Sequence, residues 1–265
     1  MSDQVSRLGT FFAAVTFFTR IPRPKWPRFQ PSDETHAAAF APYIGWIVGL
    51  FAGAVYIVSA AFLPVSLSVL ATLIAISWLT GALHEDGLSD FVDGWLGGQT
   101  RERTLAIMHD PRIGVFGGLA LILGVAVKFA ALFELAGLLS PLTLTAIIVA
   151  AHATSRLVAI SFMWTHHYVR SDETSAKGRR LSRPMPLGWL ALACVGAAIP
   201  FAATAVTAPA LLLVGLGLLV FRFVFANALT NRLGGYTGDC LGAAQQMAEI
   251  LFYVGAVACF MPPGS

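Results

Sequence analysis

The sequence predicts an all-α fold, a polytopic transmembrane helical bundle that forms a single integral membrane domain over residues 1–265. Three observations predict it. Hydrophobic residues make up 57% of the chain, charged residues make up only 12%, and apolar runs of spanning length recur. A soluble domain of this size carries roughly twice that charge, and an apolar run of about 20 residues can cross a bilayer as a helix. We therefore expect no soluble module and no nucleic-acid partner.

The predicted elements begin with a short helix at the membrane interface. Residues 8–21 form an apolar run that is too short to span comfortably and ends near Arg20, which favours an interfacial helix. Prolines at 22, 24, 27 and 31 then predict an extended segment. About seven spans follow, over 38–63, 66–83, 114–139, 141–163, 186–207, 208–230 and 244–262. Pro64, Pro141 and Pro209 mark tight turns between consecutive spans.

The basic residues predict the orientation of these spans. Of the 17 Lys and Arg residues, only Lys128, Arg156 and Arg222 lie inside a predicted span. The others fall before residue 36, within 84–113, within 164–185 and at Arg232. With seven spans, all of these segments lie on one side of the membrane. By the positive-inside rule that side is the cytoplasm, so we expect the chemistry at the cytoplasmic face and the C-terminus on the other side.

The acidic stretch His84–Gly98 is the strongest candidate for a functional site. Read as a helix, it places Asp86, Asp90 and Asp93 at i, i+4 and i+7, on one face. Three carboxylates so close together repel one another unless a cation lies among them. Hard oxygen ligands of this kind suit Mg²⁺, particularly when substrate phosphates complete its coordination shell. The alternative is a solvated polar loop at a helix end.

A second candidate stretch, Arg101–Gly118, combines arginines with glycines. Arg101, Arg103 and Arg112 could clamp a phosphate, and Asp110 could serve as a further metal ligand or a general base. Gly114 opens the next predicted span, where free N–H groups and the helix dipole favour an anion. The alternative is that the arginines only anchor the loop in the cytoplasm and the glycines only pack helices.

The third candidate stretch is glycine-rich and lies on the same predicted face. Residues 234–239 read GGYTGD, and such a backbone can bring Thr237 and Asp239 close to a phosphate or a sugar. On its own this motif is a weak signal. It gains weight because it shares a membrane face with the acidic stretch.

Charged residues inside the predicted spans form a separate set. Lys128 and Glu134 predict a pair that packs or snorkels along one helix. His152 and Arg156 lie four residues apart, and they could contact substrate or only pair. Glu249, in the last span, is a functional candidate by its position or simply the partner of Arg222 or Arg232.

Four blocks of sequence resemble the cobalamin synthase family (adenosylcobinamide-GDP ribazoletransferase). They are FFTRIPRP at 17–24, LHEDGLSDFVDGWLGG at 83–98, RERTLAIMHDPRIGVFGGLAL at 101–121 and GGYTGDCLGAAQQMAEI at 234–250. The resemblance implies a multi-pass enzyme of the bacterial inner membrane that requires Mg²⁺. Such an enzyme joins adenosylcobinamide-GDP to α-ribazole, or to its 5′-phosphate, and releases GMP in the last steps of the nucleotide-loop assembly of vitamin B12. His109 and Pro111 depart from the pattern expected around Asp110.

This reaction agrees with the chemistry of the candidate residues. Asp86, Asp90 and Asp93 would hold Mg²⁺ against the substrate pyrophosphate, and Arg103 or Arg112 would offset the charge on the leaving GMP. Asp93 and Asp110 are candidates for the general base. His84 is their rival because its unperturbed pKa lies nearest neutrality.

Two other classes of protein remain open at this stage. A cation transporter would also carry acids within the membrane, although it would need functional residues on both faces. A lipid-headgroup phosphotransferase would use a similar aspartate helix at the membrane. Membrane lipid is an expected partner in each case, and the sequence leaves open whether the chain forms a homo-oligomer.

Overall fold

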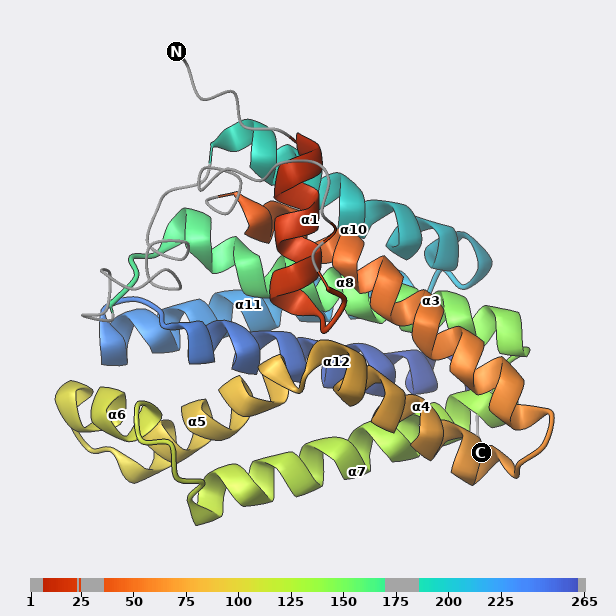
Figure 1. Ribbon diagram of the computed structural model, residues 1–265, viewed down its shortest axis with the longest axis horizontal. Helices are drawn as coiled ribbons and strands as arrows, with labels where there is room; N and C mark the ends of the chain where they lie inside the picture. Colours follow the sequence, from red (N-terminus) through yellow and green to blue (C-terminus); the bar gives the residue numbers. More distant parts are fainter. Residues whose placement is uncertain (1–6, 23, 25–35, 170–185, 262–265) are drawn as a thin grey trace.

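The computed structural model describes residues 7–22, 24, 36–169 and 186–261, and helices make up most of this part of the chain (Figure 1). The all-α prediction is confirmed: within the described residues, β structure is limited to one isolated bridge between Tyr168 and Tyr236. The elements are α1 (Arg7–Phe18), η1 (Ala37–Phe40), α3 (Ala41–Ala60), α4 (Val65–Thr80), α5 (Leu83–Gly97), α6 (Arg101–Met108), α7 (Val115–Leu138), α8 (Pro141–Thr165), α10 (Leu187–Thr207), α11 (Leu211–Leu233) and α12 (Gly238–Phe260).

The prediction of a multi-pass membrane bundle is also confirmed. In the described part of the chain, 6 helical segments are long and apolar enough to cross a membrane, and the bent pair α4–α5 makes a seventh if it counts as one span. One predicted span, 66–83, differs in the structure. Its helix α4 ends at Thr80 and the chain turns by 88° into α5, so the acidic stretch is the second half of a broken span.

The break between α4 and α5 has a local cause. Gly81 and Ala82 both adopt left-handed backbone angles, with φ of 65° and 55°. This conformation is common for glycine after a helix but costs a non-glycine residue about 1–2 kcal/mol. The N-terminal segment packs on the break, where the N–H of Arg20 donates to the Leu79 carbonyl at 2.7 Å. Broken helices of this kind line binding sites in membrane proteins.

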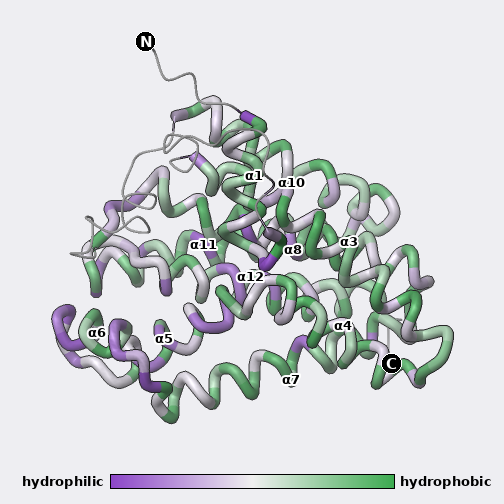
Figure 2. The backbone as a smooth tube through the Cα atoms, viewed as in Figure 1, coloured by the Kyte–Doolittle hydropathy of each residue, from purple (hydrophilic) through white to green (hydrophobic). Residues whose placement is uncertain are grey.

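The two ends of the bundle differ in polarity. In Figure 1, α6 and the first turn of α7 lie at one end, while the α3–α4 turn, the α7–α8 turn and the C-terminus lie at the other. Figure 2 shows hydrophilic residues gathered where α5 and α6 lie, and mostly apolar residues toward the opposite end. Helix α1 crosses the long helices at a steep angle (Figure 1).

Helix α8 is the most buried of the described spanning segments. Of its most apolar 18-residue stretch, 78% is buried inside the protein. Glycines of α3 let the two backbones meet. A Cβ atom at Gly45 would lie 2.6 Å from the carbonyl oxygen of His152, and one at Gly49 would lie 2.6 Å from Cα of Val149. Close approach over small residues is a typical way to join helices in a bilayer. It fixes the position of the polar residues that α8 carries.

Candidate active site

A pocket opens between the N-terminal segment and the bundle, and it contains the main polar groups of two predicted motifs. Its walls come from α1, η1, the start of α3, α5, α8 and α12. Among mostly apolar and glycine residues, its charged or titratable lining residues are His84, Asp86, Arg156 and Asp239. The first and third candidate stretches of the sequence therefore meet at one place, as their shared face predicted.

The meeting of α5 and α12 depends on two glycines in contact. A Cβ atom at Gly87 would lie 3.1 Å from Cα of Gly242 and 3.3 Å from the carbonyl oxygen of Asp239. These spacings are tighter than ordinary van der Waals contact, so the helices can approach this closely only without side chains at the crossing. As a result Asp86, next to Gly87, and Asp239 line the same pocket.

The glycine-rich motif forms the turn between α11 and α12, and its last two residues begin α12. We predicted a last span over 244–262, whereas the helix begins at Gly238. Thr237 is its N-cap: the hydroxyl accepts a hydrogen bond from the Cys240 N–H at 3.3 Å and donates to Asp239 Oδ2 at 3.4 Å. Asp239 lies in the first turn and is 6% exposed. The positive end of the helix dipole stabilises its carboxylate there. Substrate binding by Thr237 and Asp239 stays a prediction.

His84 lies in the first turn of α5 and is buried. Its ring stacks on that of Phe18 in α1, with 6.0 Å between centroids and 12° between planes. Both residues line the pocket. The N-terminal helix thus fixes the orientation of the imidazole at the pocket wall.

Asp93 has backbone partners that the sequence did not suggest. Its Oδ2 accepts a hydrogen bond from the Gly114 N–H at 2.7 Å, and its Oδ1 accepts one from the Gly117 N–H at 2.8 Å. The sequence predicts an anion at the N-terminus of this span, and in the structure the carboxylate of Asp93 occupies that position. Among Asp86, Asp90 and Asp93, only Asp86 belongs to the pocket lining that the structure describes. Metal binding by the other two, and substrate binding by Gly114, stay predictions.

Asp110 and Arg112 form an exposed ion pair in the loop before α7. Arg112 donates from Nε at 2.9 Å and from Nη2 at 2.6 Å. Hydrogen bonding from Arg112 lowers the pKa of Asp110 to about 2, which makes this carboxylate a weak proton acceptor near neutral pH. Arg103 is exposed on α6. None of the three is part of the described pocket lining, so their catalytic and substrate-binding roles stay predictions.

Two other arginines join the α5–α6 segment to α11. Arg101 donates from Nε to the Leu233 carbonyl at 2.7 Å. Arg232 donates to the Gly98 carbonyl and stacks over the Trp95 ring at 4.5 Å from its centroid. These contacts hold the acidic helix against the bundle.

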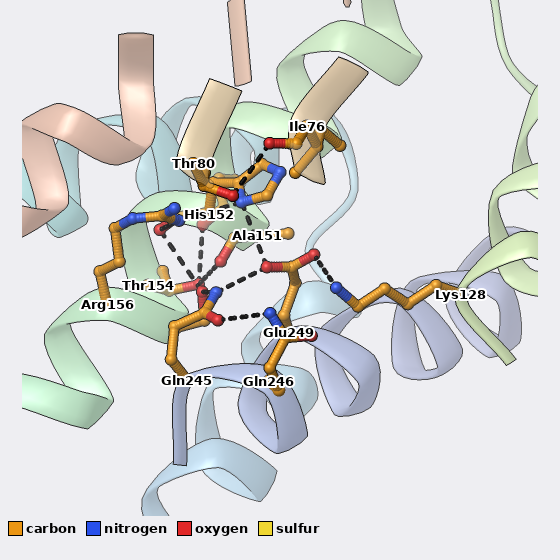
Figure 3. A network of polar contacts seen from close by, with 12 residues as sticks. Ile76, Thr80, Lys128, Ala151, His152, Thr154, Arg156, Gln245, Gln246 and Glu249 are labelled. Atoms are coloured by element: carbon orange, nitrogen blue, oxygen red, sulfur yellow. Dashed lines mark hydrogen bonds and ion pairs between the residues drawn. The ribbon is translucent and has the colours of Figure 1, made fainter. Parts of the chain in front are cut away.

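Behind the pocket lies a buried polar network that crosses three helices (Figure 3). Lys128 of α7 forms an ion pair with Glu249 Oε1 of α12 at 2.9 Å. Glu249 Oε2 lies 3.2 Å from His152 Nδ1 of α8 and accepts a hydrogen bond from Gln245 at 2.6 Å. Arg156 Nη1 donates to the His152 carbonyl at 3.0 Å. The network connects the middle of the bundle to the pocket.

This network corrects two pairings expected from the sequence. Lys128 pairs with Glu249 across two helices and not with Glu134, which is exposed. Glu249 pairs with a lysine and a histidine and not with an arginine. The only sequence signal was the presence of charge in three spans, because the partners lie far apart in the chain.

The donor set of the pocket fits Mg²⁺ only in part. Within the residues that the structure describes, no group of three or more His, Cys, Asp or Glu could hold a metal ion by itself. Asp86 and Asp239 nevertheless line one pocket. Mg²⁺ commonly takes one or two carboxylates and completes its shell with water and substrate phosphates. These two residues fit such a site, and metal binding by Asp90 and Asp93 stays a prediction.

The fold and the pocket together define a polytopic helical membrane protein with a pocket that the second half of a broken span helps to line. Residues 10–257 match the model of a family described as cobalamin-5-phosphate synthase. The chain belongs to this family, and it is a transferase.

Curated relatives support this membership over nearly the whole chain. An adenosylcobinamide-GDP ribazoletransferase of Shewanella putrefaciens is 40% identical over 258 residues, which are 96% of this chain and 97% of the relative. Those of Shewanella oneidensis and Shewanella woodyi are 40% and 38% identical over 257 and 248 residues, covering 96% and 94% of this chain and 96% and 95% of the relatives. No solved structure matches the chain.

Proposed function

We propose that the protein is a Mg²⁺-dependent transferase that joins adenosylcobinamide-GDP to α-ribazole, or to its 5′-phosphate, and releases GMP. The observation that carries the proposal is the shared pocket of Asp86 and Asp239, which come from separate motifs of a family matched over residues 10–257. We infer that the enzyme lies in the bacterial inner membrane and that its pocket faces the cytoplasm, because the positive-inside rule assigns all of the basic segments to that side.

The reaction requires little covalent chemistry from the protein. A ribose hydroxyl attacks the phosphorus attached to cobinamide, a new P–O bond forms, and the bond to the GMP oxygen breaks with its electron pair on GMP. The hydroxyl proton goes to a base. When bound, Mg²⁺ would neutralise charge on the pyrophosphate, and Asp86 and Asp239 are the residues that would hold it.

The structure favours His84 over the other base candidates. His84 lines the pocket, whereas Asp93 accepts hydrogen bonds from the start of α7 and Asp110 is bound by Arg112. A neutral imidazole at the pocket wall can accept the hydroxyl proton. The apolar wall around it would restrict water during transfer.

The test is turnover of the purified protein followed by ³¹P NMR. With Mg²⁺, adenosylcobinamide-GDP and α-ribazole or its 5′-phosphate should give GMP, and chelation of Mg²⁺ should stop its release. The same protein should not transfer headgroups from CDP-alcohols to their acceptors. Transfer from a CDP-alcohol with no GMP released from adenosylcobinamide-GDP would contradict the proposal and favour the lipid-headgroup phosphotransferase.

A further inference from the structure

We propose that Arg156 binds a phosphate group of the substrate within this pocket, held in place from behind by the Lys128–Glu249–His152 network. This inference rests on the proposed function for the identity of the substrate. It adds an anion-binding residue that none of the candidate motifs contains.

The contacts of Arg156 leave part of its guanidinium unused. The residue is 1% exposed and lines the pocket together with Asp86 and Asp239. Nη1 donates to the His152 carbonyl and lies 3.0 Å from His152 Nδ1. Within the described part of the chain, Nε has no hydrogen-bond partner. A buried donor without a partner is costly, so a ligand that accepts a hydrogen bond from this group should bind favourably.

The ion pairs around Arg156 leave its guanidinium available to an anion. Glu249 is in direct contact with Lys128 at 2.9 Å and lies 3.2 Å from His152 Nδ1. Glu249 and Glu85 attract the Arg156 guanidinium through space only. Among the described residues, no carboxylate forms an ion pair with Arg156. The guanidinium therefore has no described carboxylate in direct contact with it, and its charge is weakly screened at this buried position.

The network fixes the direction of the guanidinium. His152 Nδ1 cannot accept from Arg156 and donate to Glu249 at the same time. In either tautomer the His152 carbonyl, held by the close α3–α8 packing at Gly45, still accepts from Nη1. Arg156 is thus positioned before any ligand arrives, and preorganisation reduces the entropy cost of binding.

A phosphate fits this arrangement better than a carboxylate or a neutral sugar. The pocket presents one cation and two acids, Asp86 and Asp239. A substrate anion there must offset the acids by sharing a divalent cation with them, and a pyrophosphate has enough oxygens to contact that cation and a guanidinium together. The inferred ligand of Arg156 is the pyrophosphate that links cobinamide to GMP.

The test compares two ligands that differ by the GDP group, which carries the pyrophosphate. Equilibrium dialysis with purified protein and Mg²⁺ gives Kd for adenosylcobinamide-GDP and for adenosylcobinamide, and GMP release gives KM and kcat. Arg156→Gln should weaken adenosylcobinamide-GDP by about tenfold to a hundredfold, as expected for lost charge-assisted hydrogen bonds. Its affinity for adenosylcobinamide should stay at the wild-type value.

Two further variants complete the comparison. Arg156→Lys keeps the charge but not the planar donors, so it should weaken adenosylcobinamide-GDP several-fold, and it carries the test if Arg156→Gln fails to fold. Arg222→Gln is the matched control. Arg222 contacts Ser161 at 3.2 Å and is not part of the described pocket lining, so both affinities should be unchanged.

Wild-type affinity for adenosylcobinamide-GDP in both Arg156 variants would overturn the inference, as would an equal loss for the two ligands. The proposed function fails separately, if the wild-type protein releases no GMP in the presence of α-ribazole or its 5′-phosphate. In that case the difference in Kd between the two ligands still reports on Arg156.

Discussion

Gly87 of α5 and Gly242 of α12 are in backbone contact: a Cβ atom built at Gly242 would lie 3.0 Å from Cα of Gly87 and 3.2 Å from the His84 carbonyl oxygen. This crossing holds the two acidic segments of the pocket together. The distance between Asp86 and Asp239 depends on it.

Gly87→Ala should therefore lower activity without preventing membrane insertion. The added methyl group must push α5 away from α12, and overpacking of this kind typically costs about 1–3 kcal/mol. We expect kcat/KM to fall by about tenfold or more, because small displacements of positioning groups have large effects on transfer rates. Gly137→Ala in α7 is the control, since nothing lies within 4 Å of the added methyl group. Equal activity in the two variants would contradict the role given to the crossing.

The meeting of these two segments could be predicted from the sequence, because in the predicted layout both follow spans that end on the side with the basic residues. The break at Gly81 and Ala82 could not. The apolar run continues through it, and the bend depends on a left-handed Ala82 and on packing of Arg20 against Leu79. A glycine within an apolar run does not by itself predict an 88° turn.

The sequence left open whether Arg156 contacts substrate or only pairs, and it could not decide between the two. The network around Arg156 joins residues of α7, α8 and α12, and the pairing depends on which helices are neighbours. The contact of Asp93 with Gly114 could be predicted in part. An anion was expected at the start of that helix, and the two residues are only 21 positions apart in the chain. The sequence could not show that the anion would come from the protein.

Asp93→Ala should destabilise the protein without changing its response to Mg²⁺. The substitution removes acceptors for two N–H groups at the start of α7, which we expect to cost about 1–3 kcal/mol and to lower Tm by several degrees. The checks are thermal unfolding in detergent and the apparent KM for Mg²⁺. Glu102→Gln, an exposed acid in the first turn of α6, should change neither. A large rise in the KM for Mg²⁺ in Asp93→Ala would instead make Asp93 a metal ligand.

Asp110 should not determine how activity depends on pH. Its pKa is lowered from 3.8 to about 2 by Arg112, so the stabilising pair is present above the unfolded pKa and is lost only as the pH falls toward 2. Between roughly pH 5 and pH 8 the charge on Asp110 stays constant. The pH–rate profile of Asp110→Asn should therefore follow that of the wild type over this range. Loss of the acidic limb in the variant would identify Asp110 as the general base.

The orientation of the bundle can be tested with reporter fusions. If the bent pair α4–α5 counts as one span, the chain crosses the membrane seven times, and the C-terminus lies opposite the basic segments. Alkaline phosphatase fused at the C-terminus should be active, and a fluorescent protein inserted between Gly98 and Arg101 should fluoresce in the cytoplasm. A C-terminal fusion that is active only in the cytoplasm would contradict this topology.

The most direct test of a shared site is a double-mutant cycle on Asp86 and Asp239. The measured quantity is kcat/KM for GMP release from adenosylcobinamide-GDP at saturating Mg²⁺. If both carboxylates act in one site, Asp86→Asn and Asp239→Asn should each lower kcat/KM by at least about a hundredfold. The double variant should then be little worse than either single one, because residues that act as a unit are strongly non-additive. Near-wild-type activity in either single variant, or losses that multiply in the double variant, would contradict a single site.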